Sequence, residues 1–366
     1  MMSWNKLLLF NHGTIHGFKA RCKQVCKYNN VNNNNNHHHK KMLSVLENKN
    51  NPMFQFQIPQ GISLTLEQDE MLYNFTKEGG VLALTGAGLS TESGIPDYRS
   101  PDGSYSKGHK PILHSEFINN SYKRKRYWAR SIIGYKFFDN AEPNIAHHAL
   151  RELERKNIVS NIITQNVDSL HFKAGSRSAL ELHGCNRDVV CQSCGFIEPR
   201  PNYQDRIKNL NLEWIKEHLP HVLETLNEDD DDGILLKKIT RQKSQQTDLR
   251  ADGDAHLGDV DFNSFQVPKC ERCVEGLMKP NVVFFGGNME TDVRHLSTKK
   301  VEQANKLLIC GTSVFVFSAY RLCLKANELG KEIGILNVGE TRADKFSKFK
   351  FETKCGDALN TLAKRF

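Results

Sequence analysis

The sequence lacks an apolar run long enough to cross a bilayer, and it lacks an excess of basic residues beyond its first segment. No stretch of about 18 or more apolar residues occurs, and the mean hydropathy is −0.54. We therefore expect no transmembrane helix and no membrane partner. The formal charge is +8, but residues 1–46 hold seven Lys and Arg and no Asp or Glu. The near-neutral remainder argues against a surface built for direct nucleic-acid binding.

The composition of the N-terminal segment, residues 1–50, predicts a targeting sequence rather than a part of the folded domain. Residues 1–28 combine basic residues with Trp4, Leu7–Phe10 and Phe18 and lack acids, which is typical of import presequences. The Asn- and His-rich tract over 29–39 has little apolar surface to bury, so we expect disorder there. We expect delivery to the mitochondrial matrix. The alternatives are a tail without targeting function and a cytoplasmic or nuclear protein.

The ten cysteines do not predict a disulfide framework, because such frameworks belong to short secreted chains. Four of them form two Cys-x-x-Cys pairs, Cys191/Cys194 and Cys270/Cys273. Four thiolates leave no open position on Zn²⁺, so we expect one structural zinc ion. The pairs are 75 residues apart, and the acidic run Glu228–Asp232 lies between them. It predicts a flexible insertion over about 227–261, with a docking site for a basic partner as the alternative.

Apolar segments between turn residues predict an α/β fold over residues 51–366. Thr65 followed by Gln68 forms a capping-box pattern at the start of a helix. Strands that alternate with helices favour a Rossmann-like, doubly wound parallel sheet. We place this sheet in residues 60–100, 145–184 and 280–366, with a smaller zinc-binding and helical domain inserted as 101–144 and 185–279. The expected strands are Val81–Thr85, Ile158–Thr164, Lys306–Cys310 and Glu332–Val338, and the expected helices are Ala146–Lys156, Tyr203–Leu226 and Ala319–Leu329.

A glycine-rich loop follows the first expected strand. Val81–Thr85 runs directly into Gly86-Ala87-Gly88, and a further glycine stands at Gly94. Glycines after a buried strand let backbone N–H groups approach a pyrophosphate, and a following helix N-terminus would favour its negative charge. Alone, this pattern is also compatible with a tight strand-to-helix turn.

The continuation of this loop resembles a known family. Gly86–Ser100, GAGLSTESGIPDYRS, resembles the cofactor loop of the sirtuins, the NAD-dependent protein deacylases. Further matches follow in the family's order at Thr164–His171, Leu182–Gly184, the two cysteine pairs, Pro280–Gly286, Gly311–Ser313 and Asn337–Gly339. The resemblance covers roughly residues 55–366. Arg126–Arg130, Lys173–Arg177 and Ser264–Pro268 resemble the class II branch, which is typically mitochondrial or bacterial. Its mammalian member is associated with lipoamidase, deacylase and ADP-ribosyltransferase activities.

The resemblance implies a reaction in which the acyl group of a modified lysine on a protein moves to ADP-ribose and nicotinamide leaves. It assigns His183 as the general base and Asn166 to ordering ribose or water. A histidine suits proton transfer near neutrality. It implies that Gln165 touches the ribose, that Asp168 and Ile95 hold the carboxamide, and that Cys355 lies near the adenine. The implied NAD-binding residues are Gly86, Ala87, Gly88, Thr91, Ile95, Pro96, Asp97, Tyr98, Arg99, Gln165, Asn166, Val167, Asp168, Gly311, Thr312, Ser313, Asn337, Val338, Gly339 and Cys355.

The resemblance also implies a substrate site. Val283, Phe284 and Phe285 would pair with an extended acyl-lysine peptide. An acidic residue usually follows Gly286 in the family, but this chain has Gly287, which puts peptide affinity in doubt. Tyr127 and Arg130 have the Tyr-x-x-Arg spacing with which class III sirtuins recognise acidic acyl groups. A surface helix with a snorkelling arginine explains the same spacing equally well.

Four other functions remain as alternatives. Mono-ADP-ribosylation of protein, or a lipoamidase-type deacylation, would use the same NAD site. A Rossmann dehydrogenase would leave the cysteine set and His183 unexplained. An idle NAD-binding scaffold would fit Gly287 and the long insertion. The sequence leaves the acyl chain, the protein substrates and the oligomeric state open.

Overall fold

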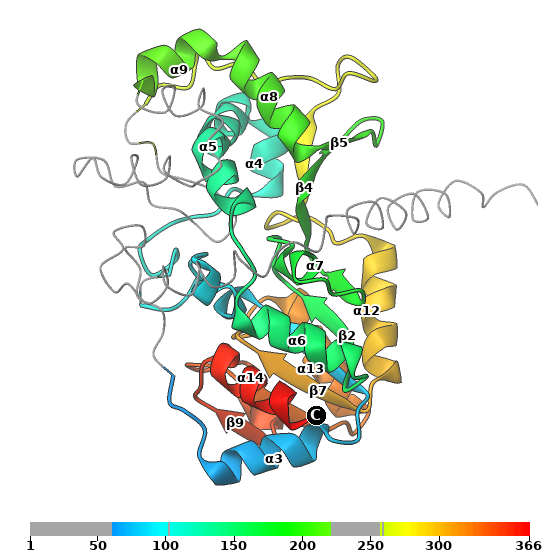
Figure 1. The fold of residues 1–366 in the computed structure, drawn as a ribbon. Helices are drawn as coiled ribbons and strands as arrows, with labels where there is room; N and C mark the ends of the chain where they lie inside the picture. Colours follow the sequence, from blue (N-terminus) through cyan, green and yellow to red (C-terminus); the bar gives the residue numbers. More distant parts are fainter. Residues whose placement is uncertain (1–60, 102, 221–256, 258–259) are drawn as a thin grey trace, which may run out of the picture. The chain divides into compact units, whose positions relative to one another are not determined.

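The computed structural model describes residues 61–101, 103–220, 257 and 260–366 (Figure 1). All of them belong to one unit, Pro52–Phe366. The predicted presequence, and all but a few residues of the predicted acidic insertion, lie outside the described residues. No helix in the described part of the chain is both long and apolar enough to span a membrane.

The centre of the fold is a six-stranded sheet in which every neighbouring pair is parallel. Its order is β3-β2-β1-β7-β8-β9. The strands are β1 (Val81–Thr85), β2 (Val159–Thr164), β3 (Ala179–Glu181), β7 (Lys306–Cys310), β8 (Ile333–Leu336) and β9 (Phe349–Phe351). The strand order reverses between β1 and β7, and ligands of such sheets bind outside the carboxyl ends of the strands at that point. The predicted Rossmann-like architecture is confirmed.

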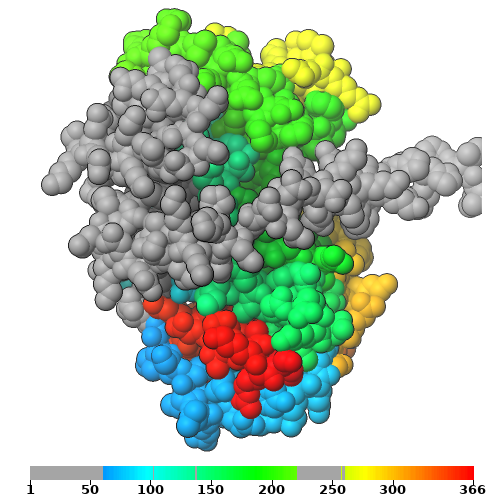
Figure 2. All heavy atoms as spheres, in the orientation of Figure 1, coloured from blue at the N-terminus to red at the C-terminus, as the bar shows by residue number. Residues whose placement is uncertain are grey.

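Helices cover both faces of the sheet, which explains why its central strands β1, β7 and β8 consist mainly of apolar residues. Side chains alternate along β1: Val81 and Ala83 join the core on one face, and Leu82 and Leu84 join the core on the other. The first face is covered by α3 (Leu66–Thr76), α6 (Ile145–Arg155) and α14 (Cys355–Arg365), and the second by α12 (Thr291–Gln303) and α13 (Phe317–Glu328). Figure 2 shows α14, in red, between α3 and α6 at the surface.

Helix α3 begins as its sequence predicts. The Thr65 side chain accepts a hydrogen bond from the Gln68 N–H, and the Gln68 side chain accepts one from the Thr65 N–H. This reciprocal pair satisfies two of the N–H groups that a helix start leaves unpaired. The predicted capping box is confirmed.

A smaller module carries its own core. Its antiparallel sheet, in the order β5-β4-β6, consists of β4 (Gly184–Cys191), β5 (Ile197–Pro199) and β6 (Met278–Val282). Its helices are α4 (His114–Asn119), α5 (Ser121–Asp139), α8 (Arg200–Leu210) and α9 (Leu212–His218). They pack around fully buried aromatic side chains that include Phe117, Trp128, Tyr203 and Phe265. Figure 1 shows α8 beside β4 and β5, with α5 packed against α8 and α9 following α8.

The prediction of one continuous helix over Tyr203–Leu226 is wrong within the described residues. The structure has two helices, α8 and α9, with Asn211 between them. The Asn211 amide donates to the Ile207 and Gln266 carbonyls, 2.8 Å each, and accepts from the Gln266 N–H at 2.7 Å. Asparagine side chains compete in this way with helical backbone bonds.

Candidate active site

A cavity of about 600 Å³ opens where the carboxyl ends of β1 and β7 meet the smaller module. It brings together nearly all predicted catalytic, cofactor and substrate residues, from the loop after β1, the loop after β2, His183, the segment after β6, and the loops after β7 and β8. Of the predicted cofactor and substrate residues, which all lie in the described part of the chain, only Gly86, Pro96 and Arg130 do not line it. Lining residues that the sequence did not indicate include Ser90, Tyr105, Ile112, Phe317, Ser318 and Lys354.

Two glycine loops meet backbone to backbone in the floor of the cavity. The Gly88 N–H donates to the Gly311 carbonyl at 2.9 Å. A Cβ on Gly88 would lie 2.9 Å from that oxygen, and a Cβ on Gly311 would lie 2.5 Å from the Leu89 nitrogen. Gly311 also has a positive φ of 60°, a conformation that glycine adopts without strain. The Gly-x-Gly pattern therefore makes room for the second loop as well as for a ligand.

The loop after β1 differs from the sequence expectation in one respect. The expected α-helix does not follow; two 3₁₀ helices, η2 (Ala87–Leu89) and η3 (Thr91–Ser93), take its place and end at Gly94 with a φ of 85°. Such short turns have no N-terminal macrodipole comparable to that of an α-helix. Donors to a phosphate must therefore come from individual loop N–H groups.

A buried polar cluster lies at the inner end of the cavity. The Ser90 hydroxyl donates to the Asp168 carboxylate at 2.6 Å, and the Leu170 N–H donates to its other oxygen at 2.9 Å. The Asn166 amide donates to the Ser90 hydroxyl and to the Gly86 carbonyl, 3.0 Å each. Burial raises the pKa of Asp168, and the bonds from Ser90 and Leu170 oppose that shift. The cluster could hold a carboxamide, which needs both a donor and an acceptor.

His183 faces the cavity from the connection between β3 and β4. Its Nδ1 lies 3.1 Å from the Gln165 carbonyl oxygen, and its Nε2 lies 2.7 Å from the Ser318 hydroxyl on α13. A carbonyl can only accept, so Nδ1 carries the proton and neutral Nε2 presents its lone pair. Burial lowers the pKa of His183, and the Gln165 carbonyl partly offsets this shift. The neutral ring can therefore act as a base near neutral pH.

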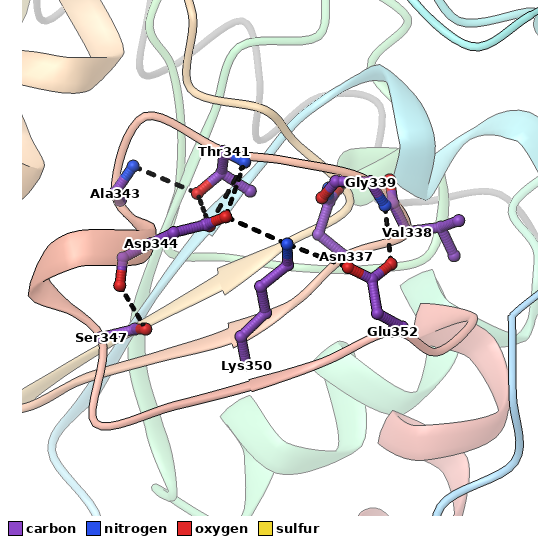
Figure 3. Close-up of polar contacts among 9 residues, drawn as sticks. All are labelled: Asn337, Val338, Gly339, Thr341, Ala343, Asp344, Ser347, Lys350 and Glu352. Carbon is purple, nitrogen blue, oxygen red and sulfur yellow. Dashed lines mark hydrogen bonds and ion pairs between the residues drawn. The ribbon is translucent and has the colours of Figure 1, made fainter.

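Another wall of the cavity comes from the loop after β8, shown in Figure 3. The Asn337 amide donates to the carbonyls of Val338 and Gly339, 2.9 Å each. The Gly339 N–H donates to the Glu352 carboxylate at 2.7 Å. The loop is therefore tied both to its own first residue and to a side chain that follows β9.

Ion pairs connect Glu352, and through it the loop after β8, to further residues. Lys350 pairs with Glu352 at 2.9 Å and with Asp344 at 3.0 Å, and Asp344 accepts from the Thr341 N–H. Burial alone would raise the pKa of Glu352, but the Gly339 N–H and Lys350 lower it overall. Figure 3 shows the chain of contacts running from η4 (Asp344–Phe346) to Gly339.

The four predicted metal ligands form one cluster away from this cavity. The Sγ atoms of Cys191, Cys194, Cys270 and Cys273 all lie within 4.8 Å of one another. The Cys191–Cys273 and Cys194–Cys270 Sγ distances are 3.6 and 3.7 Å. A tetrahedral site with Zn–S bonds of about 2.3 Å requires sulfur–sulfur distances of about 3.8 Å. The donor set and its spacing therefore fit a closed, structural Zn²⁺ site.

Apolar and aromatic side chains that include Ile112, Tyr127 and Phe284 line the part of the cavity beside β6, which we call the aromatic channel. The Phe284 ring packs 5.3 Å from the rings of both Phe117 and Tyr127, and Tyr127 lines the cavity. Arg130 lies on α5, as Tyr127 does, but it is 5% exposed and is not among the described residues that line the cavity. Lys279 lies 4.7 Å from the Phe284 ring centre, and burial lowers the pKa of Lys279 to about 8.

Comparison with known proteins identifies the family. The model of the Sir2 family matches residues 86–318, which is more than half of the chain. The chain belongs to the Sir2 family. The match spans the glycine loop, the buried polar cluster, His183 and the cysteine cluster, which confirms the resemblance that the motifs indicate.

Relatives match over most of this Sir2 chain. The NAD-dependent protein deacylase SRT2 of Arabidopsis thaliana is 40% identical over 83% of this chain and 78% of its own. The human NAD-dependent protein lipoamidase sirtuin-4, mitochondrial, is 39% identical over 82% and 88%. The NAD-dependent protein deacetylase 2 of Bradyrhizobium diazoefficiens is 40% identical over 77% and 92%.

Solved structures of Sir2 proteins share the fold. One solved for the mechanism and regulation of Sir2 enzymes is 26% identical, with a TM-score of 0.60 over 82% of this chain and 99% of its own. A complex of a Sir2 homologue with ADP-ribose is 28% identical, with a TM-score of 0.58 over 81% and 95%.

Proposed function

We propose that this Sir2 chain is an NAD-dependent protein lysine deacylase. It transfers the acyl group of a modified lysine to ADP-ribose and releases nicotinamide. The observation that carries the proposal is the neutral Nε2 of His183 at the cavity wall, oriented by the Gln165 carbonyl. Relatives at 39–40% identity that are named deacylase, lipoamidase and deacetylase support the same chemistry.

Residues in different parts of the cavity would have different roles in binding and catalysis. NAD would supply the ribose carbon from which nicotinamide departs. The loops at Gly88 and Gly311 would cradle its phosphates, Thr312 and Ser313 and the Asn337–Gly339 loop would bind its adenosine half, and Gln165 would contact its ribose. Buried Asp168, with Asn166 and Ile95, would hold the carboxamide and exclude water from the reacting bond. His183 would then take a proton from a ribose hydroxyl at Nε2, which makes that oxygen a nucleophile toward the acyl carbon.

Zinc would act through structure alone. The four cysteine ligands would fill its coordination sphere, so bound Zn²⁺ would fasten the ends of β4 and the segment before β6. Cys191 and Cys270 belong to the same buried cluster as Tyr127 and Phe284. The metal would therefore support the aromatic channel indirectly.

The channel favours apolar over acidic acyl groups. Ile112, Tyr127 and Phe284 line it, while Arg130 stays behind the lining formed by the described residues. A lipoyl-type or other apolar chain gains burial there, whereas a carboxylate would need a cationic partner. Arg130→Ala tests the opposing hypothesis of an acidic tail: a selective loss of glutaryl-peptide turnover, with acetyl turnover intact, would support that hypothesis and contradict ours.

Mono-ADP-ribosylation of protein is the alternative use of the same site. Deacylation consumes acyl-lysine and yields acyl-ADP-ribose, whereas ADP-ribosylation leaves label from NAD on protein. A panel of acyl-lysine peptides with NAD and mass-spectrometric detection of the sugar product tests the proposal. Acyl-ADP-ribose in equal amount with nicotinamide is expected; protein-bound label without this product would favour the alternative.

We also propose that the protein works in mitochondria. The bovine and human relatives are named as mitochondrial, and the acid-free residues 1–46 have a presequence-like composition. A fluorescent fusion of residues 1–50 should enter mitochondria. A fusion that stays in the cytosol would remove this proposal and leave the enzymatic one unaffected.

A further inference from the structure

The His183 ring is bound on both sides by groups from different parts of the fold. Gln165 follows β2 and holds Nδ1 at 3.1 Å, and Ser318 on α13 holds Nε2 at 2.7 Å. The Gln165 side chain is itself fixed, because its amide donates to Thr312 at 2.8 Å. The Ser318 contact thus adds a partner at the nitrogen on which the proposed chemistry depends.

Ser318 occupies a place where helix formation does not require a serine. It is the second residue of α13, whose N-cap is Val316, and no side chain caps this helix. Its hydroxyl contacts His183 instead, and both side chains line the cavity. The sequence did not indicate this residue, since 135 positions separate the two partners.

The chemistry of Nε2 makes this contact consequential. A neutral imidazole has one lone pair at Nε2, so Ser318 and a ribose hydroxyl cannot both donate to it at full strength. A serine hydroxyl, however, can donate to the neutral ring and accept from the protonated ring. Ser318 can therefore satisfy Nε2 before the sugar arrives and after the proton has been transferred.

We propose that Ser318 is a positioning residue for His183. Its hydroxyl donates to Nε2 in the free enzyme, yields the lone pair to the ribose hydroxyl, and then accepts the Nε2–H bond of the imidazolium. The proton balance is simple: the ribose O–H bond breaks, the Nε2–H bond forms, and Ser318 keeps its own proton throughout. This inference rests on the proposed deacylase function.

The effect of Ser318 on the His183 pKa can be distinguished from the effects of the charged groups nearby. The charged side chains that line the same cavity are Glu92, Asp97, Arg99, Asp168, Glu340 and Lys354. None of them contributes to the shift in the His183 pKa, which comes from burial and from the Gln165 carbonyl. A change of pH dependence in a Ser318 variant can therefore be assigned to the lost hydroxyl.

The test separates the two halves of the reaction. Nicotinamide leaves before the base acts, so exchange of labelled nicotinamide into NAD, in the presence of acyl peptide, reports the first half. Formation of acyl-ADP-ribose reports the second. For Ser318→Ala we expect acyl-ADP-ribose formation to fall about tenfold, the loss of one hydrogen bond, while exchange is unchanged or faster. Ser318→Thr keeps the hydroxyl and should restore product formation.

The pH profile gives a second readout. A bond to the charged imidazolium is stronger than a bond to the neutral ring. We therefore expect that removing the Ser318 hydroxyl lowers the pKa of His183, in addition to the effects of burial and of the Gln165 carbonyl. The acidic limb of product formation should therefore move to lower pH in Ser318→Ala. Ser160→Ala is the matched control, because this exposed serine donates to a carbonyl at the amino end of β1, away from the cavity.

The outcomes decide between the claims. If Ser318→Ala slows exchange and product formation equally, or changes neither, or leaves the acidic limb in place, the positioning role is wrong. If wild type releases no nicotinamide with any acyl peptide, the proposed function itself fails. An active wild type combined with one of the first three results overturns only the role of Ser318.

Discussion

At the scale of single residues, the site depends on short polar contacts between segments far apart in the chain. Ser90 and Asp168 are 78 positions apart, and their contact of 2.6 Å is fully buried. His183 depends in the same way on Gln165 and Ser318. Buried polar groups are costly when unpaired, so each contact has a measurable effect.

Removing the Ser90 hydroxyl should destabilise the protein in a pH-dependent way. Burial already raises the pKa of Asp168 above its ordinary 3.8, and Ser90→Ala should raise it further. A raised pKa in the folded state costs stability only where the carboxyl is ionised in the unfolded chain. The extra loss of unfolding free energy should therefore be small near pH 4, grow as the pH rises through the raised pKa, and reach about 1.5–3 kcal/mol at pH 7.

Ser93→Ala is the control for this measurement. Ser93 lies in the same loop, and its buried hydroxyl has no hydrogen-bond partner among the described residues. Denaturant unfolding of both variants at several pH values would reveal the difference. A Ser90→Ala loss that stays constant from pH 4 to pH 7 would show that Asp168 does not carry the effect.

At the scale of elements, buried apolar strands were predictable and tertiary contacts were not. β1, β7 and β8 are short, mainly apolar segments next to turn residues, so their composition and their boundaries located them. The break at Asn211 depends on Gln266, 55 residues away. Ser90 and Ser318 were missed for the same reason, since a serine has no sequence pattern that reveals its distant partner. Tyr127 and Arg130 share a helix, but only packing decides which of them reaches the cavity.

The loop after β8 gives a prediction at this scale. Glu352→Ala removes both the acceptor for the Gly339 N–H and one of the two acidic partners of Lys350. The loop should lose its preferred conformation, and the KM for NAD should rise about three- to tenfold with little change in kcat. Glu352→Gln keeps an acceptor and should have the smaller effect, because partly exposed ion pairs contribute little.

Lys348→Met serves as the matched control. Lys348 pairs with Glu332 and lies at the amino end of β9, where its N–H donates to Ile333. Breaking this pair should leave the KM for NAD unchanged. Steady-state kinetics with varied NAD would contradict our account if Lys348→Met and Glu352→Ala raised the KM equally.

At the scale of the whole molecule, two cores share one cavity. The sheet supplies the glycine loops and the Asn337–Gly339 loop, and the smaller module supplies Tyr127 and Phe284. The cysteine cluster belongs to the core of that module, which also contains Tyr127 and Phe284, so metal binding should stabilise the aromatic channel. Composition and cysteine spacing predicted the module, but they did not reveal that its core forms a wall of the site.

Loss of zinc should therefore reduce activity without touching the NAD loops. Cys191→Ser should lose the metal and most deacylation, since three remaining thiolates no longer close the site. Cys323→Ala is the control, because this buried thiol on α13 lies outside the cluster. Metal analysis should give one zinc per chain for wild type and Cys323→Ala. Full zinc content in Cys191→Ser would contradict the assignment.

The central claim is that the glycine loops bind NAD and that His183 acts as the base in a reaction that releases nicotinamide and transfers the acyl group of a lysine to ADP-ribose. The most direct measurement incubates the purified, zinc-loaded chain with NAD and acyl-lysine peptides and quantifies nicotinamide and acyl-ADP-ribose. We predict equal amounts of both products for wild type and no acyl-ADP-ribose for His183→Ala. Absence of nicotinamide release by wild type with every peptide offered, or full acyl-ADP-ribose formation by His183→Ala, would contradict the account.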